Sequence, residues 1–173
     1  ILQVRDHLNR EAIEQAIDHL AGASRVELYA VGQSAVVAHD AHLKFLRFGI
    51  PTSACTDPRI QPLAANVLRP GDAVVVVSSG GKLPGLLEVA DTARRRGARV
   101  IAITASGSPL ARKADVALIA DHVEDAGSHL PMISRILHLL LIDILAVGLA
   151  MRRSGRTDDT ALPLPQELDE PAA

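Results

Sequence analysis

The chain has 173 residues, of which 48% are apolar and 22% charged; this suits one globular domain with a substantial core. Its net charge of −2 gives no overall electrostatic footprint for nucleic acid, and its 2% of aromatic residues argues against a base-stacking platform. The single cysteine, Cys55, excludes a disulfide framework and a cysteine metal cluster, and it fits a reducing cytoplasm.

Apolar periodicity and turn residues predict that helices and strands alternate along the chain. The expected elements are a helix between Asn9 and Gly22, a strand at 26–31, a helix at 35–48, a strand at 50–55, a helix at 57–68, a strand at 74–77, a helix at 84–96, a strand at 98–104, a short helix ending at Lys113, a strand at 116–120 and a long helix at 131–153. Pro62 lies inside the 57–68 segment, so that helix is expected to begin late or to kink. Residues 154–173 lack an apolar period and are expected to be a disordered tail.

This alternation predicts an α/β domain with a parallel sheet. Right-handed crossovers and five strands favour a three-layer, doubly wound, flavodoxin-like sheet in the order 2-1-3-4-5. In that order the first and third strands are neighbours, and the connections change direction between them. Loops 32–34 and 78–82, which follow these two strands, are therefore expected to face each other across one crevice.

The most informative stretch is Val74-Val75-Val76-Val77-Ser78-Ser79-Gly80-Gly81-Lys82. Four successive valines predict a strand that is buried on both faces, and the serines and glycines after it lead into a helix. Backbone N–H groups at such a turn, together with the positive end of the helix dipole, form an anion site. The spacing of a Walker A loop is absent. The alternative is an ordinary strand-to-helix turn without a ligand.

The predicted ligand-binding residues come from the two facing loops: Gln33, Ser34, Ser78, Ser79, Gly80, Gly81 and Lys82. Serine hydroxyls can donate hydrogen bonds to phosphate oxygens, and Lys82 can add positive charge. Two structural alternatives stay open, because Ser34 can serve as a helix N-cap alone and Lys82 as a solvated residue of the first turn. The G-x-G-x-x-G fingerprint is missing, so nicotinamide dinucleotide binding is not expected.

Catalysis would need an acid or a base, and the candidates are His39, His42, Glu124, His129 and His138. His39 and His42 are three residues apart, but no third metal ligand follows them at a diagnostic spacing, so no metal site is predicted. Leucines surround His138, which favours a packed or interfacial histidine. Glu124 follows the fifth strand closely enough to reach the crevice, and it is counted among the ligand-binding candidates. The sequence favours binding over catalysis, with no catalytic residue and no cofactor expected.

The helix expected over 131–153 is apolar almost all round, yet His138 and Asp143 interrupt it. Its uninterrupted apolar run falls well short of the roughly 20 residues that a membrane span needs. We therefore expect no membrane partner. A helix this apolar in a soluble domain buries its second face against a partner, and an isologous homodimer is the expected arrangement.

Several motifs together resemble one family. They are Ala30-Val31-Gly32-Gln33-Ser34, Lys44-Phe45-Leu46-Arg47-Phe48-Gly49, Ile101–Thr104 followed by Ser108-Pro109-Leu110-Ala111, and Ser134-Arg135 with Leu141-Ile142-Asp143. In this order they resemble a sugar isomerase (SIS) domain, and more narrowly the C-terminal effector domain of RpiR-type bacterial transcription regulators. The resemblance runs from about residue 9 to residue 153.

The resemblance implies a phosphosugar effector and a homodimer, or a tetramer, formed through the helix at 131–153. It also implies a DNA-binding helix-turn-helix domain before residue 1, and we expect the chain, which begins with Ile1, to be a piece of a longer protein. Within the family the chain is most similar to the hex-regulon repressors of glucose metabolism, whose effector is 2-keto-3-deoxy-6-phosphogluconate. Two alternatives remain: a phosphosugar aldose/ketose isomerase, and a degenerate domain kept for dimerisation.

Residue by residue, the serine of the family's first loop corresponds to Ser34. The family's phosphate loop usually has the pattern Ser-x-Ser-Gly-x-Thr, and Ser78 and Gly81 match its first serine and its glycine. Gly80 replaces the second serine and Leu83 the threonine, so two hydroxyl donors are lost. Each hydroxyl is worth about 0.5–1.5 kcal/mol in a hydrogen bond. An acidic position of the family near the cleft corresponds to Glu124.

Overall fold

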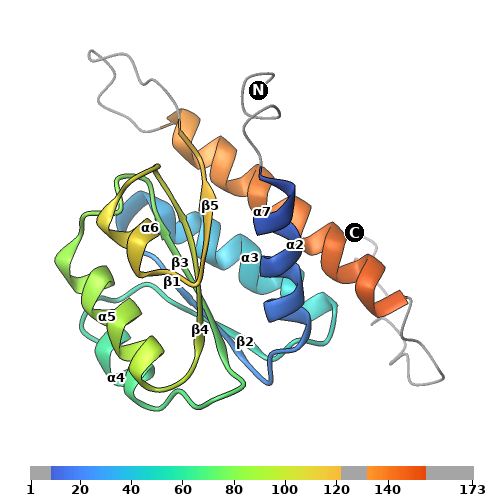
Figure 1. Ribbon diagram of the computed structural model, residues 1–173, viewed down its shortest axis with the longest axis horizontal. Helices are drawn as coiled ribbons and strands as arrows, with labels where there is room; N and C mark the ends of the chain where they lie inside the picture. Colours follow the sequence, from blue (N-terminus) through green and yellow to red (C-terminus); the bar gives the residue numbers. More distant parts are fainter. Residues whose placement is uncertain (1–8, 122–131, 155–173) are drawn as a thin grey trace, which may run out of the picture.

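The computed structural model describes residues 9–121 and 132–154, and within them one sheet of five parallel strands organises the fold (Figure 1). The strands are β1 (Val26–Tyr29), β2 (Thr52–Cys55), β3 (Ala73–Ser78), β4 (Arg99–Thr104) and β5 (Val116–Ile119). Their order in the sheet is β2-β1-β3-β4-β5, which confirms the predicted 2-1-3-4-5 arrangement. The first and third strands therefore lie side by side.

Helices cover both faces of the sheet and complete the three layers (Figure 1). On one face lie α2 (Arg10–Ala21), α3 (Ala35–Arg47) and α7 (Met132–Ser154), and on the other lie α4 (Gln61–Asn66), α5 (Pro84–Arg95) and α6 (Pro109–Lys113). A single 3₁₀ turn, η1 (Gly32–Ser34), links β1 to α3. The doubly wound architecture that the alternation predicts is confirmed.

The valine run forms the centre of both cores. Val75 and Val77 pack with residues of α2, α3 and α7, whereas Val74 and Val76 pack with residues of α4 and α5. At most 1% of each of these four side chains is exposed. Full burial of one such side chain stabilises the fold by about 1.5–3 kcal/mol. This strand thus fixes where the loop after residue 78 emerges.

Local signals account for the helix ends. The side chain of Asn9 accepts a hydrogen bond from the N–H of Ala12 at 3.2 Å, which is the predicted N-cap of α2. Helix α4 begins only at Gln61, later than residue 57, as expected from a proline at its second position. Strands β1 and β2 are shorter than predicted, because the backbone leaves the sheet two residues before η1 and joins it only after Pro51.

Helix α7 is the one helix, among the described residues, that is long and apolar enough to cross a membrane: Ile133–Arg152 have a mean hydropathy of 2.0. It nevertheless packs against α2 and α3 as a core helix, with 44% of that span buried in the fold. The large side chains buried from it are Leu137, Leu141, Ile142, Leu145 and Leu149, and those exposed on its outer side are Ile133, Ile136, Val147 and Met151. The helix therefore has one face in the core and one apolar face toward solvent.

Candidate functional site

Two loops meet at the carboxyl edge of the sheet, the edge at which the strands end. β1 pairs with β3, so η1 and the loop after Ser78 emerge next to each other. A small cavity lies between them, with a volume of about 10 Å³, and its lining residues are Gln33, Ser34, Ser79, Ser134, Arg135 and His138. Such a volume holds about one water molecule, so the cavity marks the point where these side chains converge rather than a finished ligand pocket.

The first loop presents Ser34 at the start of α3. Gly32 has a φ of 58°, and the chain then makes the 3₁₀ turn that leads directly into the helix. The hydroxyl of Ser34 makes no hydrogen bond to the helix N-terminus, and Ser34 itself has helical backbone angles. The structure thus gives no support to a capping role for this hydroxyl, which lines the cavity at the positive end of a 13-residue helix.

Ser78, the last residue of β3, anchors the second loop. Its side-chain oxygen accepts a hydrogen bond from the N–H of Gly81 at 3.2 Å, and only 6% of the residue is exposed. Gly81 has a φ of 57°, and its carbonyl accepts from the N–H of Leu110 at 3.1 Å. The carbonyl of Ser79 accepts from the N–H of Ala105 at 3.1 Å. These bonds fix the loop so that Ser79, half-buried, is the serine on the cavity wall.

Gly81 is tightly enclosed. A Cβ atom there would lie 2.4 Å from Oγ1 of Thr104 and 2.5 Å from Oγ of Ser108, two side chains that hydrogen-bond to each other at 3.2 Å. The predicted residues Ser78 and Gly81 therefore shape the loop and do not line the cavity. Gly80 is exposed with open space around it, and Lys82 is exposed and outside the cavity lining. Glu124 lies outside the described residues.

Helix α7 supplies half of the lining, which the choice of site residues from sequence missed. Ser134 and His138 are buried, with 2% and 1% of each residue exposed. Arg135, which follows Ser134 in the sequence, is half-buried. Ser134 and His138 are four residues apart and so share one helix face. Ser134 and His138, four residues apart in a mostly apolar helix, are the signal that could have identified this wall.

The chemistry of the lining favours an anion. Arg135 is the charged side chain among the lining residues, no carboxylate is among them, and Ser34 and Ser79 bring hydroxyl donors. Within residues 9–121 and 132–154, no group of three or more His, Cys, Asp or Glu side chains could hold a metal ion. Burial raises the pKa of the Cys55 thiol, so this cysteine is not an activated nucleophile.

Comparison with known proteins agrees with this fold. The SIS domain family matches residues 19–148 of the chain. The bifunctional protein glk of Paraburkholderia xenovorans is 56% identical over 161 residues, which are 93% of this chain and 25% of that protein. The HTH-type transcriptional regulator HexR of Escherichia coli is 39% identical over 167 residues, 96% of this chain and 58% of that protein. The chain thus spans about a quarter of the first relative and little more than half of the second.

Two solved structures share the architecture. The SIS domain of an RpiR transcription factor from Sphaerobacter thermophilus superimposes with a TM-score of 0.73 at 29% identity, covering 90% of this chain and 91% of that one. The NanR protein of Vibrio vulnificus, complexed with ManNAc-6P, gives a TM-score of 0.83 at 22% identity and covers 89% of this chain and 59% of that one. At 22% identity, the similarity to NanR shows a shared fold alone.

Proposed function

Because this chain belongs to the SIS domain family, we propose that it is the effector-binding domain of a bacterial transcriptional regulator of sugar catabolism. A sugar phosphate binds at the carboxyl edge and modulates DNA binding by a separate domain. The observation that carries the proposal is the convergence of Ser34, Ser79 and Arg135 on one cavity at the starts of two helices. The likeness to HexR and to an RpiR SIS domain supports the regulatory role.

The proposed ligand is a phosphorylated sugar acid, with 2-keto-3-deoxy-6-phosphogluconate as the first candidate. Its phosphate receives hydrogen bonds from the hydroxyls of Ser34 and Ser79, beside the start of α3, where the helix dipole favours negative charge. Arg135 pairs with the second anionic group, the carboxylate. Since the cavity has room for only about one water molecule, binding requires the walls to separate, and this movement is the means of signalling.

The regulator is proposed to act in the cytoplasm as a homodimer, with a tetramer as the larger alternative. The exposed apolar stripe of α7 supports this assembly, because contiguous apolar surface marks a site of protein–protein contact. The stripe consists of Ile133, Ile136, Val147 and Met151. Lys44 of α3 forms ion pairs with both Asp40 and Asp143 beside this stripe, so α3 and α7 present one connected face.

A phosphosugar isomerase is the second candidate. It would bind the same class of ligand, and His138 on the cavity wall is the described side chain that could move a proton there. The cavity lining offers no described carboxylate base, which favours binding without turnover. Conversion of aldose and ketose phosphates by the full chain would support the isomerase and contradict the sensor.

Calorimetric titration of the chain with 2-keto-3-deoxy-6-phosphogluconate tests the proposal. We expect micromolar binding, no binding of the unphosphorylated analogue, and a loss of affinity of about 10-fold or more when Ser34→Ala and Ser79→Ala are combined. Ser24→Ala, an exposed serine at the opposite edge of the sheet, is the matched control and should bind normally. Absence of binding by every sugar phosphate tested would refute the proposal and leave dimerisation as the remaining role of the domain.

A further inference from the structure

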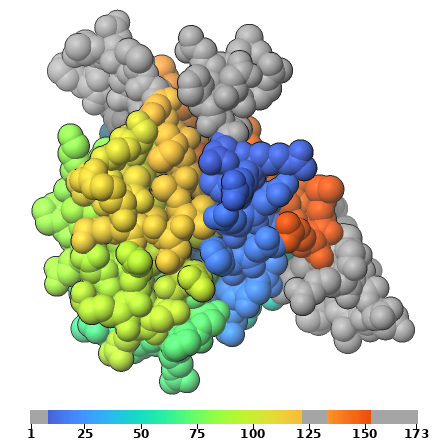
Figure 2. All heavy atoms as spheres, viewed as in Figure 1, coloured from blue at the N-terminus to red at the C-terminus, as the bar shows by residue number. Residues whose placement is uncertain are grey.

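The opposite, amino edge of the sheet carries a concentration of arginines. Three turns lie there, at residues 22–25, 69–72 and 94–99, and they precede β1, β3 and β4. The turns are tied together by backbone bonds: the N–H of Ser24 donates to Gly71 at 2.9 Å, and that of Arg99 donates to Asp72 at 3.0 Å. In Figure 2, the chain near residue 70 (green) and the end of α5 (yellow-green) form adjoining parts of the surface.

The charge at this edge is strongly positive. The arginines are Arg25, Arg69, Arg94, Arg95, Arg96 and Arg99, and the neighbouring carboxylates are Glu27, Asp72 and Asp115. Six positive charges against three negative ones leave an excess of three, in a chain whose overall net charge is −2. The overall charge therefore conceals a local basic surface, which we call the arginine edge.

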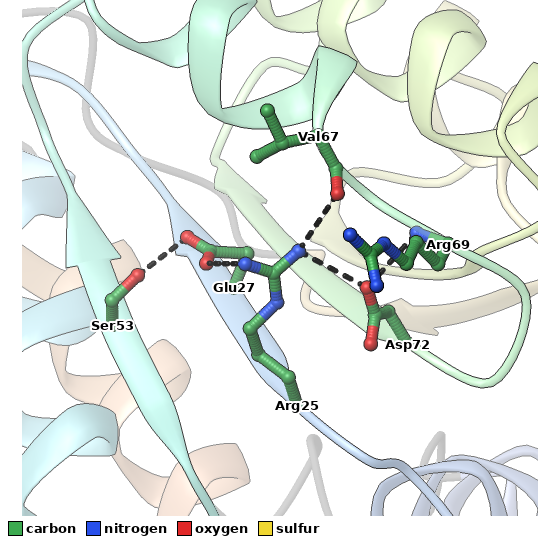
Figure 3. A network of polar contacts seen from close by, with 6 residues as sticks. All are labelled: Arg25, Glu27, Ser53, Val67, Arg69 and Asp72. Atoms are coloured by element: carbon green, nitrogen blue, oxygen red, sulfur yellow. Dashed lines mark hydrogen bonds and ion pairs between the residues drawn. The ribbon is translucent and has the colours of Figure 1, made fainter.

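A partly buried ion network fixes the base of this surface (Figure 3). Arg25 donates to the carboxylate of Asp72 at 3.1 Å and to the carbonyl of Val67 at 3.2 Å, and it lies 3.7 Å from Glu27. The N–H of Arg69 also donates to Asp72, at 2.9 Å. The guanidinium of Arg25 is thus engaged by groups of the protein itself, and the network holds the turn that carries Arg69 in place.

The outer arginines stay available. Arg94 and Arg99 lie 3.9 and 3.8 Å from Asp115, yet 49% and 62% of their side chains are exposed, and such surface pairs contribute about 0–1 kcal/mol. Arg69, Arg95 and Arg96 are exposed as well. Next to them is an open hollow of about 430 Å³, lined by Ser24, Arg25, Val67, Arg69, Pro70 and Asp72.

We propose that the arginine edge binds the phosphate backbone of DNA without reading its sequence. The charged side chains facing outward here are arginines, whose guanidinium groups match phosphate geometry, and the surface lacks the aromatic residues that typify protein interfaces. That DNA is the polyanion encountered rests on the proposed function. The edge would add weak backbone contacts to those of the separate DNA-binding domain and make operator binding more sensitive to salt.

Fluorescence anisotropy with a labelled duplex of arbitrary sequence, titrated with the 173-residue chain over a range of salt concentrations, tests this inference. We expect binding at low salt, with a negative slope of log affinity against log salt. Each phosphate contact contributes about −0.9 to that slope. The variant Arg69→Ala, Arg95→Ala, Arg96→Ala should make the slope shallower by about two to three and weaken binding at low salt.

The control variant is Arg10→Ala, Arg59→Ala, Arg112→Ala, which removes the same charge from exposed positions on the carboxyl side of the sheet, away from the arginine edge. If both variants lose affinity equally, or if the chain binds no duplex at low salt, the inference is wrong. Equal binding of poly-glutamate would assign the surface to acidic polypeptides and also overturn it. Circular dichroism establishes that both variants are folded. The readout contains no sugar phosphate, so it is independent of whether the carboxyl-edge site binds its proposed ligand.

Discussion

Substitution of Gly81 by alanine should destabilise the domain strongly. An alanine at a φ of 57° costs about 1–2 kcal/mol, and its Cβ would overlap Thr104 and Ser108 at 2.4–2.5 Å, which adds about 1–3 kcal/mol of overpacking. Separation of the hydrogen bond between those two side chains costs about 1 kcal/mol more. We therefore expect a loss of about 3–6 kcal/mol, a large part of the 5–15 kcal/mol that typically stabilises a domain.

Gly80→Ala is the matched control, because a Cβ at Gly80 meets nothing within 4 Å. We expect a change of less than about 0.5 kcal/mol for this neighbouring substitution. Urea denaturation followed by circular dichroism compares the two midpoints, since the chain has no tryptophan. If Gly81→Ala proves as stable as Gly80→Ala, the loop is not held against β4 and α6 in the described way, and the placement of Ser79 on the cavity wall loses its basis.

Three further predictions concern the loop and the core. Gly80→Ser restores the family hydroxyl and should raise the affinity for a sugar phosphate about 2- to 10-fold; calorimetry against Gly80→Ala checks this, and an equal affinity would contradict it. Burial raises the pKa of Tyr29, the single tyrosine, so above pH about 10 only the tyrosine of the unfolded state ionises, and the stability of the fold decreases. Tyrosinate absorbance should therefore rise together with unfolding. A rise in tyrosinate absorbance while the domain is still folded would contradict the burial. Gln61 is buried and donates hydrogen bonds of 3.0 and 2.8 Å to the carbonyls of Ala30 and Cys55, so Gln61→Leu should cost about 2–4 kcal/mol by urea denaturation. A neutral effect would show that those carbonyls find other donors.

The sheet could be predicted from sequence because its signals are local. The valine run has the composition of a doubly buried parallel strand, and caps such as Asn9 mark helix ends within a few residues. The strand order followed from general rules of handedness and connection rather than from any single residue. The late start of α4 also follows from one proline.

The site was predictable only in part, because its geometry depends on contacts between distant segments. The sequence gives no reason to separate Ser78 from Ser79, yet the packing of Gly81 against Thr104 and Ser108 directs one inward and the other to the cavity. The contribution of Arg135 depends on where α7 crosses the sheet edge, which no local pattern specifies. The arginine edge likewise combines three turns that are separated in sequence.

A crystal structure of the chain soaked with 2-keto-3-deoxy-6-phosphogluconate is the most direct test of the central claim. The account predicts the phosphate within hydrogen-bond distance of the hydroxyls of Ser34 and Ser79, with the carboxylate on the guanidinium of Arg135. Ligand bound away from the carboxyl edge, or bound there with its phosphate out of reach of both serines, would contradict it.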